Sequence, residues 1–426
     1  MTQAERTGED VTRTVLPTPA TADLVADIEA VAAAYRAARP GDHTGRQPVH
    51  TVYVPADRVD TATLRWFGRE ARRLLDTHAP DAAALTKAIG IPANVADAVR
   101  ARVVSKLAAE PVEDLRIDFE DGYGRRDDDV EDADAARTAR AIARLRADNA
   151  APPFFGLRIK SFADGGHLRA IRTLDVFLGT LLEAAGTLPQ GLLITFPKIV
   201  AAAHVASFAT LLERLERALG LPERSLVFEV QVETTTSIID RDGRVALPGI
   251  VEAAGGRIVG AHFGVFDYTA ACGLTGHEQR MDHPACDFAR HMMQVSLAGT
   301  GVQLSDGATN RVPADDSAAA VTAVWQHHAN LVRRSLAHGF YQGWDMHPAH
   351  LVSRFAAVFA FHRDHLEETT RRLATQASTT SKGGSVLEEP ATIQALLTSL
   401  RRAIDCGAID EATALSAARL DQAALR

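Results

Sequence analysis

Residues 191–234 read GLLITFPKIVAAAHVASFATLLERLERALGLPERSLVFEVQVET. Two short runs of apolar and β-branched residues, 191–199 and 225–234, enclose a helical pattern over 202–219. A strand, a helix and a second strand in this order predict a right-handed crossover between parallel strands. This stretch therefore places the chain in the α/β class.

The same alternation continues in both directions along the chain. Six further strand-like runs occupy residues 50–56, 114–121, 154–162, 257–268, 301–305 and 340–348. Helical patterns fill most of the intervals, as over 318–338. Eight such strands fit a closed (β/α)8 TIM barrel, and a doubly wound open sheet is the alternative. We predict the barrel.

The ends of the chain differ from this alternating part. Residues 1–45 are expected to form a polar tail and an alanine-rich helix over 21–38. The barrel is assigned to 46–373. The small and polar residues of 374–390 predict a linker or mobile loop, and 374–426 as a whole is expected to be a linker followed by a C-terminal helical extension.

Composition excludes several classes of protein. The 426 residues carry 46 Lys+Arg and 54 Asp+Glu, a formal charge of −8, which argues against general nucleic-acid binding. Three cysteines, far apart, predict neither a disulfide scaffold nor a cysteine zinc site. No run of about 18 apolar residues and no signal peptide is found, so we expect a cytoplasmic protein without a membrane partner.

Charged side chains follow nearly every predicted strand. The candidates at these positions are Arg58, Glu120, Asp121, Arg158, Lys160, Lys198, Glu233, Asp267 and His347. In a barrel, chemistry takes place at the C-terminal ends of the strands. The pattern therefore predicts one convergent ionic site at that end.

Glu233 and Asp267 end consecutive predicted strands, whose axes lie ~4.8 Å apart in a sheet. Two carboxylates with no cysteine nearby suit a hard ion such as Mg²⁺, with Mn²⁺ as a substitute. The alternative is that both carboxylates form ion pairs with arginines.

Arg158 and Lys160 alternate with apolar residues in one strand. Two cations on one face of a buried strand require anions. An arginine fork fits a substrate carboxylate or a thioester oxyanion, and pairing with Glu120 or Asp121 is the alternative.

The motifs, in order, resemble the aldolase/citrate lyase β-subunit family, which includes malyl-CoA lyases. The family's V-P-A/G-D-R, D-L-E-D-A and V-R-V-N motifs are similar to residues 54–58, 118–122 and 157–160. L-P-K, I-E-T and L-G-x-x-D-Y are similar to 196–198, 232–234 and 263–268, and D-G-V and the final H-P motif to 306–308 and 339–348. The final motif lacks the family's lysine and Lys160 replaces its asparagine, which indicates a divergent subgroup.

The resemblance implies a TIM barrel in which Glu233 and Asp267 bind Mg²⁺ and Arg158 binds the carboxylate of a keto acid. Arg58, Lys160 and Lys198 are further expected substrate-binding residues. It also implies a homo-oligomer, a trimer or hexamer, and a keto-acid or acyl-CoA substrate.

The resulting hypothesis is a Mg²⁺-dependent carbon–carbon lyase acting through a metal-stabilised enolate. Glu120 or Asp121, or else His347, would move the proton. Malate synthase-like condensation and acyl-CoA thioester hydrolysis are alternatives on the same scaffold, and a Schiff-base lysine is a third. A non-catalytic metabolite-binding barrel is the alternative from another class.

Overall fold

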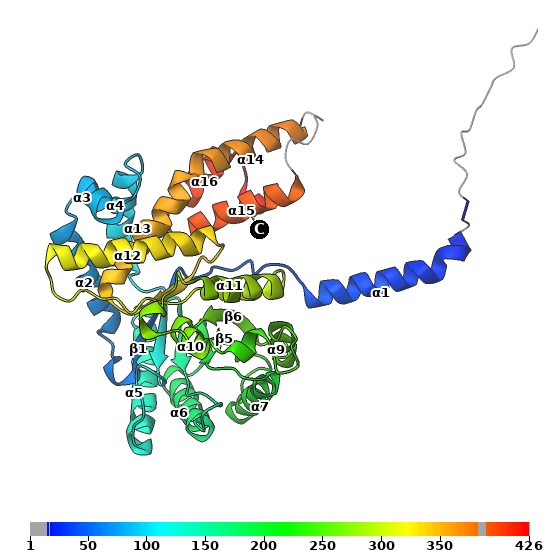
Figure 1. Ribbon diagram of the computed structural model, residues 1–426, viewed down its shortest axis with the longest axis horizontal. Helices are drawn as coiled ribbons and strands as arrows, with labels where there is room; N and C mark the ends of the chain where they lie inside the picture. Colours follow the sequence, from blue (N-terminus) through cyan, green and yellow to red (C-terminus); the bar gives the residue numbers. More distant parts are fainter. Residues whose placement is uncertain (1–14, 17, 382–388, 426) are drawn as a thin grey trace, which may run out of the picture.

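A computed structural model of the chain describes residues 15–16, 18–381 and 389–425. Eight parallel strands form one sheet in the order β7-β6-β5-β4-β3-β2-β1-β8. Ser305 of β7 bridges to Gln342 beside β8, and the Asp306 amide donates to the Gln342 carbonyl at 2.8 Å, which joins the two edges. The predicted (β/α)8 barrel is confirmed (Figure 1).

All eight predicted strands are present, and each is shorter than its apolar run. They are β1 (His50–Pro55), β2 (Asp114–Asp118), β3 (Phe154–Arg158), β4 (Leu192–Phe196), β5 (Phe228–Val232), β6 (Ile258–Phe263), β7 (Gln303–Ser305) and β8 (Gly343–Asp345).

The helices of the described residues surround and extend this sheet. They are α1 (Ala22–Ala38), α2 (Thr63–His78), α3 (Ala82–Ile89), α4 (Ala96–Ala109), α5 (Asp128–Ala147), α6 (His167–Ala185), α7 (Ala202–Leu219), α8 (Thr235–Ile238), α9 (Leu247–Ala253), α10 (Val265–Ala271), α11 (Pro284–Leu297), α12 (Ala318–Ala337), α13 (Pro348–Asp364), α14 (Leu366–Ser381), α15 (Pro390–Asp405) and α16 (Glu411–Ala418). Short 3₁₀ turns lie at Thr18–Thr21, Ala56–Arg58, Gly276–Glu278 and Gln422–Leu425.

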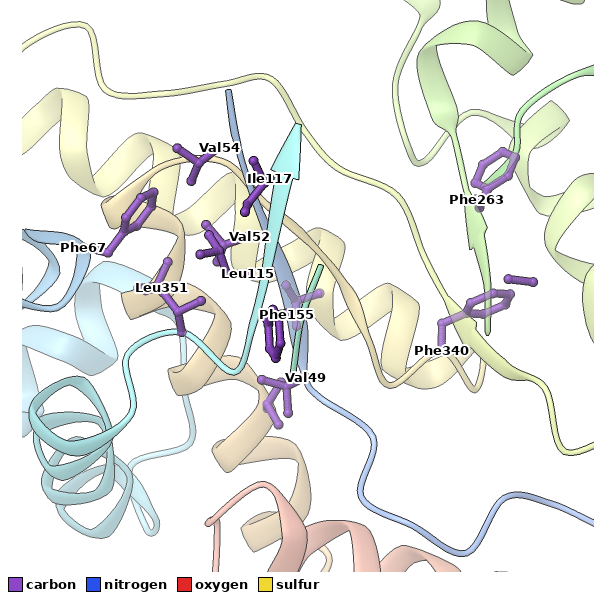
Figure 2. Packing of buried hydrophobic residues seen from close by; sticks show 14 of the residues in the cluster. Val49, Val52, Val54, Phe67, Leu115, Ile117, Phe155, Phe263, Phe340 and Leu351 are labelled. Carbon is purple, nitrogen blue, oxygen red and sulfur yellow. The ribbon is translucent and has the colours of Figure 1, made fainter. Parts of the chain in front are cut away.

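The outer faces of the strands carry the apolar core. Val52 and Ile117 belong to the same buried cluster as Phe67 of α2 and Leu351 of α13, and Figure 2 shows Val52 between the sheet and Leu351. All four side chains are buried. Their removal from water is the main favourable term that holds helices and strands together.

The inner faces are unusually polar for a barrel, whose interior is normally filled by branched apolar residues. Arg116 Nη2 lies 2.8 Å from Asp114 Oδ2 and 3.2 Å from Glu229 Oε1, on the far side of the barrel. His262 Nε2 contacts Glu229 Oε2 at 2.9 Å, and its Nδ1 accepts from the Trp344 indole at 3.0 Å. Buried charges in the interior are therefore paired across the sheet.

The C-terminal helices form a second, smaller cluster around residues such as Leu373, Leu400 and Ile409. The expected linker over 374–390 differs from the structure at its start, because α14 continues to Ser381. Residues 382–388 of that linker lie outside the described residues. The predicted helical extension is present as α15 and α16.

The predicted N-terminal helix is also present, as α1. No residue of this helix is buried, and Figure 1 shows it pointing away from the barrel. Among the described residues, we find no helix of sufficient length and apolarity to span a bilayer.

Candidate functional site

Six charged side chains form one connected group at the C-terminal ends of β2 to β6. They are Glu120, Asp121, Arg158, Lys198, Glu233 and Asp267. Lys198 follows β4, and its Nζ lies 2.8 and 2.9 Å from the two carboxylate oxygens of Asp121, which follows β2. The same ammonium contacts Glu120 and lies 3.6 Å from Asp267 Oδ2. Parallel strands place these ends on one side of the sheet, as the sequence predicted.

Arg158 is held in place by a carboxylate that the sequence did not single out. Its Nε and Nη2 each lie 2.7 Å from an oxygen of Asp118, a bidentate pair buried on both sides. Asp118 also accepts from the amides of Glu120 and Gly122 at 2.9 and 2.8 Å. Nη1 of Arg158 points to Glu120 Oε2 at 3.2 Å. One edge of the guanidinium is thus fixed and the other faces the acidic group.

Glu233 is a buried member of this group. Its Oε1 accepts from the Lys198 amide at 2.8 Å. Its Oε2 lies so close to Gly264 that a Cβ there would come within 2.3 Å of it. Burial, together with the neighbouring Asp267 and Glu120 carboxylates, raises the pKa of Glu233 to about 8. Burial and like charges therefore favour the protonated form of this carboxyl.

Lys198 adopts a left-handed backbone conformation, with φ of 49°. This region is sparsely populated for residues with a Cβ and is occupied where surrounding contacts impose it. The conformation directs the Lys198 amide to Glu233 while its side chain reaches Glu120 and Asp121.

Glu120 has an environment suited to proton transfer. Burial and the adjacent Asp121 raise the pKa of Glu120 to about 7, although Arg158 and Lys198 act in the opposite direction. Burial lowers the pKa of Lys198, but the Glu120 and Glu233 carboxylates outweigh it and raise that pKa well above its usual value. The lysine is therefore a fixed cation beside a carboxyl that titrates near neutrality.

Three candidates lie apart from this group. Lys160 Nζ contacts Glu131 Oε2 on α5 and the Phe119 carbonyl, both at 2.7 Å. Arg58 is exposed at the end of β1. His347 caps α13 by accepting from the Ala349 amide at 3.1 Å, and burial lowers its pKa.

Sequence reasoning missed Asp118 and the ionic network in the barrel. The signal was present in the alternation of charged and apolar residues in 114–118 (DLRID) and of polar and apolar residues in 228–233 (FEVQVE). Residues two apart share one face of a strand, so this alternation marks a polar inner face.

Within the described residues, one group of three potential metal-binding side chains brings its ligand atoms within 4.8 Å of one another: His328, Asp345 and His350. Its atoms already have partners. His328 Nε2 and Arg354 Nη2 lie 3.1 and 2.8 Å from Asp345 Oδ1, and His350 Nε2 is 2.8 Å from the Arg311 carbonyl. The Arg354 guanidinium already supplies the positive charge beside Asp345, so these side chains form a buried ion-pair network.

A cleft of about 440 Å³ lies at the opposite end of the barrel, between the start of β1 and α15. Gln47, Tyr341 and Arg402 are among its lining residues. It lies at the N-terminal ends of the strands, the face that barrel enzymes do not use for chemistry.

Comparison with known proteins gives a family and a fold. A family model described as a domain of unknown function, DUF6986, matches residues 28–426. No curated protein sequence matches the chain.

Among solved structures, a citrate lyase from Burkholderia xenovorans LB400 has a TM-score of 0.53 at 20% identity, covering 76% of this chain and 90% of that chain. A Haloferax volcanii malate synthase at 3 mM glyoxylate has a TM-score of 0.49 at 14% identity, covering 75% of this chain and 76% of that chain. A citrate lyase β subunit from M. tuberculosis, complexed with oxaloacetate and magnesium, has a TM-score of 0.40 at 17% identity, covering 74% of this chain and 98% of that chain. At such identities the likeness concerns the fold.

Proposed function

We propose that this chain, which belongs to the DUF6986 family, is an enzyme that breaks or forms a carbon–carbon bond next to the carbonyl of a 2-oxo or 2-hydroxy acid. The observation that carries the proposal is the group of charged side chains at the ends of β2 to β6. In it two buried carboxyls with raised pKa values, Glu120 and Glu233, lie beside Lys198 and beside Arg158, which Asp118 holds in place.

Glu233 and Asp267 would hold a divalent cation, Mg²⁺ or Mn²⁺. The fit rests on the chemistry of the donors, since both supply only carboxylate oxygens, which Mg²⁺ prefers. It also rests on Glu233 itself, because burial and the nearby Asp267 and Glu120 carboxylates raise its pKa, an effect that a bound cation would counteract. Among the described residues, no hydrogen bond occupies its Oε2. A bound cation would supply Lewis-acid stabilisation of negative charge on a substrate oxygen.

Arg158 would bind the substrate carboxylate through Nη1. Asp118 fixes the opposite edge of the guanidinium, so the side chain need not be ordered when substrate arrives. The Glu120 carboxylate, 3.2 Å from Nη1, would give way to the substrate or hold a proton beside it.

Glu120 would move the proton. A general acid or base works best when its pKa lies near the operating pH, and Glu120 meets this condition through burial and Asp121. Lys198 would stay charged and stabilise negative charge near the reacting carbon.

The Schiff-base alternative requires a lysine with a lowered pKa. Lys198 has the reverse, and Lys160 is paired with Glu131. We therefore favour an aldol or Claisen mechanism that involves no covalent bond between a lysine and the substrate. The barrel shared with the Burkholderia citrate lyase supports this reading at the level of fold.

A turnover screen tests the proposal. Purified protein is incubated with 2-oxo acids, 2-hydroxy acids and acyl-CoA thioesters, with Mg²⁺ or Mn²⁺ and with EDTA. We expect metal-dependent cleavage or condensation that Glu233→Gln abolishes. Release of free CoA without a new carbon–carbon bond would indicate thioester hydrolysis instead. Calorimetric binding without any turnover would overturn the enzyme proposal in favour of a metabolite-binding barrel.

A further inference from the structure

The helix α1 presents an apolar seam to solvent. Leu24, Ile28, Val31 and Tyr35 are 57%, 67%, 71% and 64% exposed. Their spacing of four, three and four residues is that of a coiled-coil contact face. In proteins most helical stability comes from tertiary packing of an apolar face, and no residue of α1 is buried in one copy of the chain, so this seam lacks a partner surface there.

A matching seam lies on α11. Phe288 and Val295 are 49% and 74% exposed, Met292 between them is half-buried, and the spacing is again four and three residues. The opposite face of α11 packs into the barrel through buried residues such as Cys286 and Met293. Both seams are thus solvent-facing in one copy of the chain.

The chain connects these two helices at one point. Arg39, directly after α1, donates to the carbonyl of Ala298, directly after α11. The Gly41 amide donates to the Gly299 carbonyl at 2.9 Å. From this junction α1 extends beyond the end of α11 and away from the molecule, so it does not lie on α11 of its own chain (Figure 1).

We propose that α1 is an exchanged arm that packs, in parallel, on α11 of a second copy of this chain. A two-fold axis near the junction of Arg39 and Ala298 places each α1 beside the other copy's α11 with the C-terminal ends together. Counting back from this junction sets Ile28 opposite the second copy's Phe288 and Tyr35 opposite its Val295. The contact is isologous and closes after two copies.

The area is that of a stable dimer. A helix of 17 residues is about 25 Å long and about 10 Å wide, so half of its lateral surface is roughly 400 Å². Counted on both arms and both surfaces that they cover, the exchange buries about 1,600 Å², a standard protein–protein interface.

Sedimentation velocity on the full chain tests the exchange. We expect wild type to be a dimer or an even multiple of it, and Val31→Asp or Val295→Asp to raise the dissociation constant at least about 100-fold, since each buries an unpaired charge. Ala33→Asp, on the opposite face of α1, is the matched control and should leave the dimer intact. Circular dichroism confirms that each variant is folded. A monomeric or trimeric wild type, or a Val31→Asp variant of unchanged mass, overturns the proposal.

Cysteine pairing then identifies the partner surface. In a Cys272→Ser background, Ile28→Cys with Phe288→Cys should form a covalent dimer on mild oxidation, and neither single variant should. A disulfide within one chain would show that α1 folds onto its own α11. A covalent dimer from Ile28→Cys alone would show that the arms pair with each other. Either result overturns the exchange.

Discussion

At the scale of single residues, the candidate site depends on a few side chains that each serve two neighbours. Lys198 holds Glu233 through its amide and Glu120 through its ammonium. Asp118 holds Arg158 with both oxygens while it caps the turn at Glu120 and Gly122. Each of these residues therefore affects both the shape and the charge of the site.

Glu120→Gln should lower kcat by about 10²–10⁴-fold, the range for loss of a general acid or base. Because burial and Asp121 raise the pKa of Glu120 to about 7 in the substrate-free protein, wild-type kcat/KM should titrate near neutrality and the variant should lose that titration. The measurement is a pH–rate profile on the substrate found in the screen. Asp129→Asn, an exposed residue of α5, is the control. A variant with the wild-type profile would assign the proton transfer to another group.

Asp118→Asn should destabilise the fold by about 3–5 kcal/mol, because it leaves the buried Arg158 without its carboxylate. Asp76→Asn breaks an exposed pair with Arg72 on α2 and should cost less than about 1 kcal/mol. Urea unfolding followed by circular dichroism measures both. Equal losses in the two variants would contradict the structural role of Asp118.

At the scale of elements, the junction of β6 and α10 shows how the backbone shapes the site. Gly264 lies between β6 and α10 and has an ordinary φ of −95°, so its conformation does not require glycine. The requirement is steric, since a Cβ would lie 2.3 Å from Glu233 Oε2 and 2.4 Å from Glu233 Cβ.

Gly264→Ala should displace Glu233 and weaken Mn²⁺ binding by about 10–100-fold, as when a group that orients a metal ligand is disturbed. Gly249→Ala in α9, where an added Cβ meets nothing within 4 Å, is the matched control. Calorimetric titration with Mn²⁺ compares the two. Unchanged affinity in Gly264→Ala would argue against Glu233 as a ligand.

The elements themselves were largely predictable. All eight strands and the helices at 202–219 and 318–338 follow from local apolar periodicity. The strand ends were overestimated, as in 114–121 against Asp114–Asp118, because the residues that follow a strand stay buried while they turn into the site. The extension of α14 to Ser381 was missed because small polar residues are only weakly disfavoured in a helix, so composition alone does not mark its end.

At the scale of the whole molecule, the site opposes the stability of the barrel. Burial raises the pKa of Glu233 from 4.5 to about 8. Between these values the folded protein keeps a proton that the unfolded chain has released. The stability that this bound proton gives to the folded protein is therefore lost as the pH rises from about 4.5 to about 8.

A divalent cation should reverse this loss, because it binds the ionised form of Glu233 and stabilises the folded state by mass action. We expect Mg²⁺ to raise Tm more at about pH 8 than at about pH 5.5. Glu233→Gln should show no such dependence. Calorimetric melting of both proteins, with and without Mg²⁺ at each pH, checks this prediction. A Mg²⁺ effect that is equal at both pH values would contradict cation binding at Glu233.

The class and order of the elements, and the end of the barrel where charge gathers, follow from local patterns in the sequence, because side-chain period and the order of the elements are properties of the chain itself. It placed Glu120, Asp121, Arg158, Lys198, Glu233 and Asp267 at that end, and the structure brings them together. Which of these charges pair with one another depends on the tertiary fold. Asp118 rather than Glu120 clamps Arg158, and Lys160 turns to Glu131 outside the group. Such pairings depend on distances of a few ångströms between segments far apart in the chain, and Coulomb energies change steeply over those distances.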